Sequence, residues 1–288
     1  GVVSTIGGII TGFAGNATQV GIGVVVLSTG GTLFASSMEA FQYDTLKSQG
    51  FERYFPHVLS RSVLIRMVVC GLSSILGGYL YTLDPRFPFF AVGVATAIGT
   101  VLSYWITEPP VDSQTIQMTS IAHQLSLGLA SIYHVSIRSA SLVLLAIGIL
   151  LKADSSGFWD IQAVYYGLGS RELGIVYTGV YVAMAAISLL YTRIAKRKTL
   201  HAFLFQTSLG FGIATILSAL VGAFWGSVLL IVRSVFSVLF DMRLSVFFNN
   251  HIPSRVRATT LSVISLIRGA PYILFAYTLG SMVDTIGA

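Results

Sequence analysis

Residues 18–48 read TQVGIGVVVLSTGGTLFASSMEAFQYDTLKS, an apolar stretch that contains two carboxylates, Glu39 and Asp44. A helix that crosses a bilayer needs about 20 predominantly apolar residues, and this stretch is long enough to supply them. A carboxylate inside such a span is costly in free energy, so it normally faces a protein interior or a water-filled path. The stretch predicts a membrane-spanning helix and marks both carboxylates as candidates for a functional or structural role.

The composition of the whole chain points to the same class of protein. Its 288 residues are 54% hydrophobic and only 10% charged, whereas soluble domains carry about 25% charged residues. The single cysteine, Cys70, lies in an apolar run and excludes a disulfide framework. The net charge is +6, and most of the basic residues lie in connectors between apolar runs, a distribution that favours membrane orientation and not nucleic-acid binding.

The hydropathy pattern predicts an all-α membrane protein, a polytopic helical bundle with about nine transmembrane helices. Since residues 1–14 are too few for a crossing and no signal-peptide pattern precedes them, we expect the chain to begin inside a span. The predicted spans are 1–14, 18–43, 59–82, 87–107, 138–166, 174–192, 200–221, 224–248 and 258–282.

The basic residues predict how these spans are oriented. When successive spans alternate in direction, 12 of the 17 Lys and Arg residues fall on one side, three on the other, and Arg233 and Arg268 near mid-span. Cytoplasmic connectors carry the excess of Lys and Arg, so we expect a multi-pass protein of the cell membrane. The connectors predicted to be cytoplasmic are 45–58, 108–137, 193–199 and 249–257.

The longest connector, residues 111–137, divides the predicted spans into residues 1–110 and 138–288. It carries apolar residues at spacings of three and four, which predicts an amphipathic helix that lies at the membrane surface. These apolar positions are Met118, Ile121, Leu125, Leu129 and Ile132.

Five short motifs carry a resemblance to a bacterial branch of the major facilitator superfamily. They are ASSMEAFQYDTLK (35–47), LGGYLYTLDPRFPF (76–89), TEPP (107–110), NHIPSRVRATTLS (250–262) and GSMVDTIG (280–287). The resemblance implies two six-helix halves joined by a cytoplasmic connector. Residues 1–110 would then supply helices 3 to 6 and residues 138–288 helices 7 to 11, without helices 1, 2 and 12.

What the resemblance implies about function is secondary transport of a small molecule by alternating access, including proton-coupled efflux. The antiporter pattern of helix 5, in which G-P precedes x-x-G-G, is met only in part. Gly77 and Gly78 match it, but Ser73 and Ser74 stand where the pattern has Gly and Pro. The alternative is a receptor or scaffold that keeps the fold and transports nothing. We expect no enzyme activity and no cofactor or metal, because the sequence has no phosphate-binding loop and no Cys/His cluster.

Candidate residues for the substrate or ion pathway come from two arguments. The resemblance places Glu39, Asp154, Asp160 and Arg233 on helices that line the central cavity. Arg233 and Arg268 each lie about nine or ten residues into a span, which is near the middle of an approximately 30 Å core. The predicted pathway residues are Glu39, Asp154, Asp160, Gln162, Arg233 and Arg268.

The two carboxylates of the opening stretch have two interpretations. Glu39 and Arg66 have similar predicted depths, as do Asp44 and Arg61, so structural ion pairs or a cytoplasmic gate would explain them. Glu39 would otherwise handle substrate or protons.

The later charged residues also have alternative roles. Asp241 is predicted to form a gate or capping cluster with Arg243. Arg233 would contact an anion or carboxylate of the substrate, or would pair with a carboxylate of the 138–166 span. Arg268 would donate a hydrogen bond to a backbone carbonyl that Pro271 leaves without a partner, or it would contact the 138–166 span.

Residues 154–166 are polar for a membrane span. Asp154-Ser155-Ser156-Gly157 predicts either an unwound segment that lines a cavity or the outer end of the span. Trp159, Tyr165 and Tyr166 fit an interfacial aromatic belt.

Overall fold

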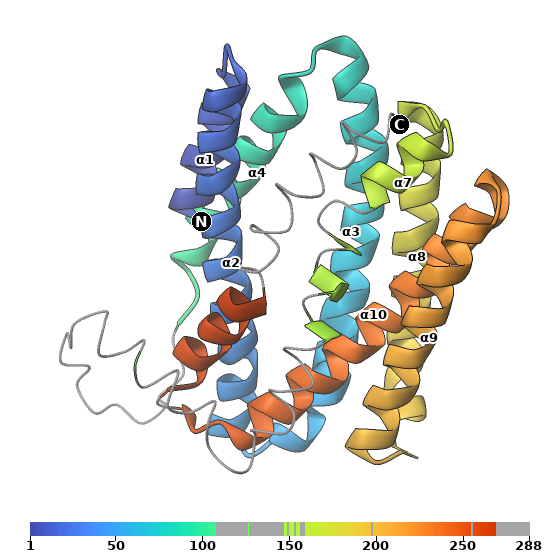
Figure 1. Cartoon of the computed structure of the whole chain (residues 1–288). Coiled ribbons are helices and arrows are strands. Elements are labelled where there is room, and N and C mark those ends of the chain that lie inside the picture. Colours follow the sequence, from blue (N-terminus) through green and yellow to red (C-terminus); the bar gives the residue numbers. More distant parts are fainter. Residues whose placement is uncertain are drawn as a thin grey trace. The chain divides into compact units, whose positions relative to one another are not determined.

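The computed structural model describes residues 1–107, 126, 147–148, 150–152, 154–155, 159–196, 198–254 and 256–268 (Figure 1). The regular elements of the described residues are helices, in agreement with the predicted all-α class. In chain order they are α1 (Val2–Gly12), α2 (Ala17–Ser48), a 3₁₀ turn (Glu52–Tyr54), α3 (Phe55–Leu83), α4 (Phe87–Ser103), α7 (Trp159–Tyr165), α8 (Ser170–Ala195), α9 (Leu200–Leu220) and α10 (Ala223–His251).

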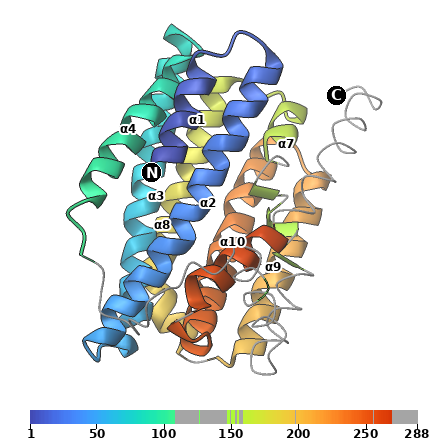
Figure 2. The same ribbon diagram turned by 90° about the vertical axis from the view of Figure 1, so that its left-hand side faces the viewer.

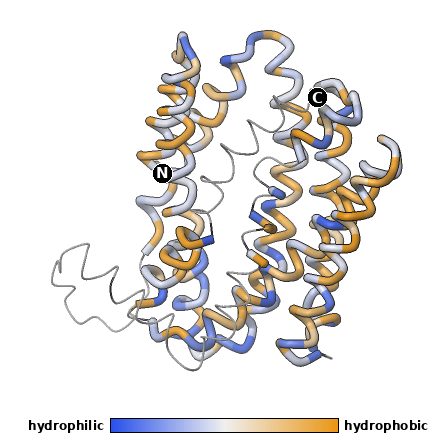
Figure 3. The backbone as a smooth tube through the Cα atoms, in the orientation of Figure 1, coloured by the Kyte–Doolittle hydropathy of each residue, from blue (hydrophilic) through white to orange (hydrophobic). Residues whose placement is uncertain are grey.

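Five of these helices are long and apolar enough to cross a membrane, as predicted for a membrane protein. They cover Ala17–Ser48, Glu52–Leu83 (which includes the 3₁₀ turn), Glu172–Ala195, Leu200–Leu220 and Ala223–His251. Hydrophobic residues run along these helices in Figure 3. Helices α1 and α4 are also apolar but shorter, with 11 and 17 residues.

The remaining predicted spans are only partly within the described residues. Residues 256–268 are helical, which covers the first part of the predicted span 258–282. In the range 138–166, residues 150–152 are helical, residues 154–155 form part of a π-helical turn, and α7 follows. The amphipathic helix predicted for 111–137 lies outside the described residues apart from Ser126, so the count of nine remains a prediction.

The helix ends follow local sequence signals. The Asn16 side chain accepts a hydrogen bond of 2.9 Å from the Gln19 amide at the start of α2, and Thr199 caps α9 in the same way at 3.3 Å. Both residue types are preferred N-caps because their side chains satisfy an amide that lacks a partner in the first turn. Gly50 and Gly167 follow α2 and α7 with φ of 73° and 70°, which glycine adopts at little cost.

The chain divides into two compact units, and their boundary cuts through α3. The first unit comprises residues 1–52 and 75–119, and the second comprises residues 53–74 and 120–288. Although α3 lies within residues 1–110, its first part groups with the helices that follow residue 120. The predicted division into residues 1–110 and 138–288 stays a prediction.

In the first unit, α1 lies against α2 and α4 through small residues (Figure 2). A Cβ added at Gly30 of α2 would come within 2.5 Å of the Ser4 amide nitrogen, and one at Gly23 within 2.8 Å of the Thr11 amide nitrogen. A Cβ at Gly8 of α1 would meet the Gly93 amide nitrogen of α4 at 2.9 Å. Small residues allow helix backbones to approach this closely, which is how helices associate in lipid.

In the second unit, α10 packs against both α9 and α8. The face of α9 that is buried carries Phe203, Thr207, Phe211, Ala214 and Ser218, at spacings of three and four. The Ser60 hydroxyl of α3 donates a hydrogen bond to the Ser188 carbonyl of α8, and both residues are buried. These contacts place the middle of α10 inside the unit, and the candidate site lies there.

Candidate functional site

Arg233 is one of the two largest fully buried residues of the described chain, with 2% of its surface exposed. It is the eleventh residue of α10, about 15 Å along the helix axis. A guanidinium keeps its charge in proteins, so a buried arginine requires compensation from nearby groups.

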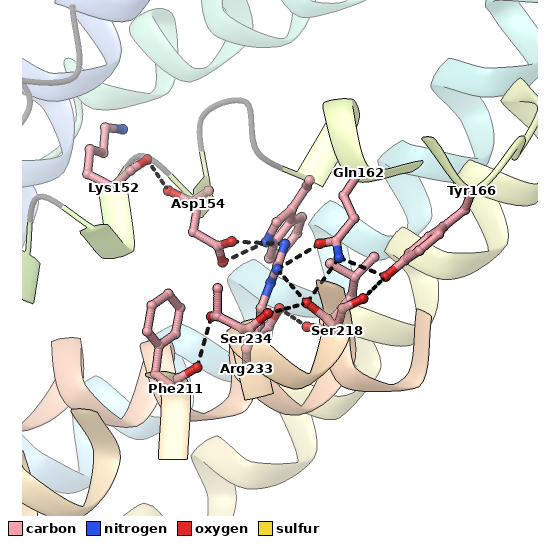
Figure 4. Close-up of polar contacts among 12 residues, drawn as sticks. Lys152, Asp154, Gln162, Tyr166, Phe211, Ser218, Arg233 and Ser234 are labelled. Atoms are coloured by element: carbon pink, nitrogen blue, oxygen red, sulfur yellow. Dashed lines mark hydrogen bonds and ion pairs between the residues drawn. The ribbon is translucent and has the colours of Figure 1, made fainter. Parts of the chain in front are cut away.

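The charge of Arg233 is compensated by Asp154, which comes from the π-helical turn that precedes α7. Arg233 Nη2 lies 2.9 Å from Asp154 Oδ1, and both side chains are nearly inaccessible at 2% and 5% exposure. Figure 4 shows the carboxylate facing the guanidinium, while the Lys152 side chain extends away from the pair. The pair brings the segment before α7 into contact with the middle of α10.

Gln162 of α7 supplies the second contact of Arg233. Its Oε1 accepts a hydrogen bond of 2.8 Å from Arg233 Nη1, and its Nε2 donates to the Ser218 hydroxyl at 3.0 Å. The Ser218 hydroxyl lies 3.4 Å from Arg233 Nη1 and itself donates to the Thr215 carbonyl at 2.7 Å. The amide of Gln162 therefore has one defined orientation between α9 and α10.

Tyr166, one turn after Gln162, extends this network to the backbone of α9. Its hydroxyl accepts a hydrogen bond of 2.7 Å from Gln162 Nε2 and donates to the Ser218 carbonyl. The ring lies over Gly226 of α10, where an added Cβ would come within 2.6 Å of Tyr166 Cε2. The absence of a side chain at Gly226 is what lets the ring reach this position.

Trp159 holds the other oxygen of Asp154. Its indole Nε1 donates a hydrogen bond of 2.8 Å to Asp154 Oδ2, and its ring stacks on Tyr177 of α8 with centroids 5.6 Å apart. The two oxygens of Asp154 are thus used by different partners, one by Arg233 and one by Trp159. We call Arg233, Asp154, Gln162, Ser218, Tyr166 and Trp159 the Arg233 cluster.

A second ion pair involves α10 two turns further on. Arg268 binds Asp241 with both terminal nitrogens, at 2.8 Å (Nη1 to Oδ1) and 3.2 Å (Nη2 to Oδ2). Its Nε donates to the Gly148 carbonyl at 3.1 Å. The predicted partner of Asp241 was Arg243, but the Arg243 guanidinium donates to the Lys198 carbonyl at 3.1 Å and lies over the Phe203 ring.

The structure brings together three of the predicted pathway residues, Asp154, Gln162 and Arg233, and places Arg268 with Asp241. The backbone of Asp160 belongs to α7, but its side chain lies outside what the structure describes. Glu39 and Asp44 are half-buried on α2 in the first unit, whereas Arg61 and Arg66 are exposed on α3 in the second. The pairs Glu39–Arg66 and Asp44–Arg61 therefore stay predictions.

Ser218 and Trp159 are members of the cluster that the sequence did not identify as site residues. Ser218 is one of many serines in apolar spans, and nothing in its sequence context sets it apart. Tyr166 was assigned to an interfacial belt, although its spacing of four from Gln162 already allows contact on one helix face.

Within the described residues no group of three or more His, Cys, Asp or Glu side chains could hold a metal ion. No family model matches the chain, and no curated protein matches it.

Proposed function

We propose that this chain acts in secondary transport of a small polar or amphipathic molecule, in a membrane protein of the major facilitator type. The observation that carries the proposal is the Arg233 cluster: a fully buried arginine near mid-helix, paired with an aspartate and an amide. Ionisable residues inside membrane helices are expensive and typically mark substrate or ion pathways.

The cluster has the composition expected for a polar site in the interior of a membrane protein. Arg233 offers a fixed positive charge, Asp154 a group that exchanges protons, and Gln162 with Tyr166 neutral hydrogen-bonding groups. The π-helical turn at residues 154–155 supports this role, because irregular backbone at membrane depth is tolerated where it lines a cavity. In this proposal, alternating access exposes the cluster to one side of the membrane at a time.

The remaining predictions belong to the same proposal. Glu39 and Asp160 contribute further pathway groups. The protein resides in the cell membrane with its basic connectors in the cytoplasm. Its partners are lipid, the transported molecule and protons.

Transport in proteoliposomes tests the proposal. The protein is reconstituted, and uptake of a panel of anionic, neutral and cationic small molecules is measured with and without an imposed pH gradient. Arg233→Gln should reduce flux at least tenfold, whereas Arg193→Gln, a change at an exposed residue of α8, should leave it unchanged.

Two outcomes would count against this assignment. Flux that is equal in wild type and Arg233→Gln would remove the cluster from the pathway. The alternative, a receptor or scaffold, would be favoured by two results together. The protein would transport no member of the panel, and it would still fold with Glu39→Gln, Asp160→Asn and Arg233→Gln combined.

A further inference from the structure

A cavity of about 350 Å³ lies beside the start of α3, where the 3₁₀ turn joins the helix. It is lined by four residues of the second unit, Tyr54, His57, Val58 and Arg61. All of these side chains except Val58 are exposed, so the cavity is accessible from outside the protein. Its volume lies in the range of about 300–1,000 Å³ that is typical of small-molecule sites, which is enough for a polar headgroup.

The positive charge around this cavity has no acidic counterpart on the same helix. Residues 53–83 contain three arginines but no Asp or Glu. Arg61 lines the cavity together with His57, whose ring can donate a hydrogen bond. Arg53 lies beside the cavity, because its guanidinium is 4.9 Å from the centre of the Tyr54 ring and donates a hydrogen bond of 3.2 Å to the Tyr54 hydroxyl. These groups favour an anionic occupant.

A strip of exposed apolar side chains continues from the cavity along α3. Ile65, Val68 and Leu72 follow Arg61 at spacings of four, three and four residues, which places them on one side of the helix. All three are exposed, and Ile65 and Leu72 reach 64%. Because α3 is long and apolar enough to cross a membrane, this apolar strip lies at the depth of the acyl chains when the helix spans a bilayer.

We propose that the cavity binds the headgroup of an anionic phospholipid, whose acyl chains lie along the apolar strip. Arg61 and His57 donate hydrogen bonds to phosphate oxygens, and Arg53 adds positive charge beside them. The connector 45–58 is predicted to be cytoplasmic, and anionic lipids of the cytoplasmic leaflet attract basic residues next to a membrane span. The inference does not depend on the proposed function, since a receptor or scaffold with this helix would bind the same lipid.

A phospholipid matches the site better than a soluble phosphate compound does. A soluble compound would use only the cavity and leave the apolar strip uncovered, whereas buried methylene groups of a lipid add to the free energy of binding. The exposed Glu52, which precedes Arg53 in the 3₁₀ turn, does not line the cavity. The occupant therefore has both an anionic group and acyl chains.

Native mass spectrometry of the full chain, released from detergent micelles, measures this binding. The protein is titrated with dioleoyl phosphatidylglycerol or with dioleoyl phosphatidylcholine, which has the same acyl chains but no net charge. We expect the first phosphatidylglycerol molecule to bind at least about fivefold more tightly than phosphatidylcholine. Glycerol 3-phosphate, which has the anionic group without acyl chains, should not displace the lipid.

Variants separate a defined site from general attraction to charge. Arg61→Gln should weaken phosphatidylglycerol binding about fivefold, the contribution expected of one basic residue near a membrane surface. The matched control is Arg193→Gln, which removes the same charge from an exposed residue of α8 and should leave binding unchanged. Val58→Trp fills the cavity without a change of charge and should also weaken binding. If that variant does not fold, the comparison of Arg61→Gln with Arg193→Gln still decides.

Three results would overturn the inference. Equal weakening by Arg61→Gln and Arg193→Gln would mean that net charge attracts the lipid and that the cavity does not. Unchanged binding by Arg61→Gln would leave Asp44 as the predicted partner of Arg61. Displacement of the lipid by glycerol 3-phosphate would make the ligand a soluble phosphate compound. None of these results bears on the flux measurement, so the proposed function stands or fails separately.

Discussion

Helices meet in two contrasting ways in the two units of this chain. In the first unit, α1 and α2 approach through Gly23, Gly30, Ser4 and Thr11, where an added methyl group would collide with backbone. In the second unit, the middle of α10 contacts neighbouring segments through the Arg233 cluster. The first kind of contact needs only small side chains, whereas the second places charge where it is costly. Packing of small side chains therefore explains the contact between α1 and α2, but it does not explain the contact that the Arg233 cluster makes in the second unit.

The largest expected effect comes from removing the carboxylate of the cluster. Asp154→Asn leaves a buried guanidinium that cannot lose its charge, and breaking a buried pair in this way costs about 3–5 kcal/mol of unfolding free energy. Arg233→Gln should cost less, because the remaining carboxyl group can take a proton. Unfolding in nanodiscs measures both.

The double variant Asp154→Asn/Arg233→Gln completes this comparison. It should be more stable than Asp154→Asn alone, since no uncompensated charge remains. A double variant that is as unstable as the sum of both single variants would show that the two residues act independently.

A methyl group at the α1–α2 contact tests the other side of the comparison. Gly30→Ala should lower the free energy of unfolding by about 1–3 kcal/mol, because the new Cβ overlaps Ser4. The control is the neighbouring change Gly31→Ala, where no described residue lies within 4 Å of the added Cβ. Equal stability of the two variants would mean that the close approach does not stabilise the first unit.

Loss of a single hydrogen bond at the edge of the cluster should have a moderate effect. Tyr166→Phe removes the hydroxyl that links Gln162 to the Ser218 carbonyl, at a cost of about 0.5–1.5 kcal/mol. Tyr165→Phe is the matched change at a residue that is 74% exposed, and it should leave stability unchanged. If both variants behave alike, the hydroxyl of Tyr166 contributes nothing measurable.

The smallest effect is expected at the second ion pair. Arg268 and Asp241 are 20% and 42% exposed, whereas Arg233 and Asp154 are 2% and 5% exposed, and the cost of leaving one charge of a pair uncompensated rises with its burial. Arg268→Gln should therefore cost far less stability than Asp154→Asn in the same unfolding assay. A similar cost for both would show that burial is not what distinguishes the two pairs.

The sequence predicted the helices well, because an apolar run of sufficient length has few alternatives to a membrane-spanning helix. The ranges 18–43, 59–82, 174–192 and 224–248 fall within long apolar helices, and 200–221 exceeds α9 by one residue. Their ends were less accurate: α2 continues to Ser48 and α3 begins at Phe55. The ends were misplaced because a change from apolar to polar residues does not show where the backbone stops being helical.

The partners of the charged residues were predicted less completely. The sequence identified Arg233, Asp154 and Gln162 as candidates because polar residues in apolar spans are rare. It did not show that Ser218 and Trp159 complete the cluster, nor that Asp241 pairs with Arg268 and not with Arg243. Partners that are far apart in the sequence are determined by how the helices pack, and a single sequence does not contain that information.

The sequence by itself determined the class of this protein, its long apolar helices and the small set of charges that lie within apolar spans. The physical reason is that hydropathy and charge are properties of the residues themselves and have the same consequences in any fold. Only the tertiary structure decided which charges meet, how deeply each pair is buried and which neutral side chains complete the Arg233 cluster. Those features depend on distances and directions between side chains, which exist only once the helices are packed.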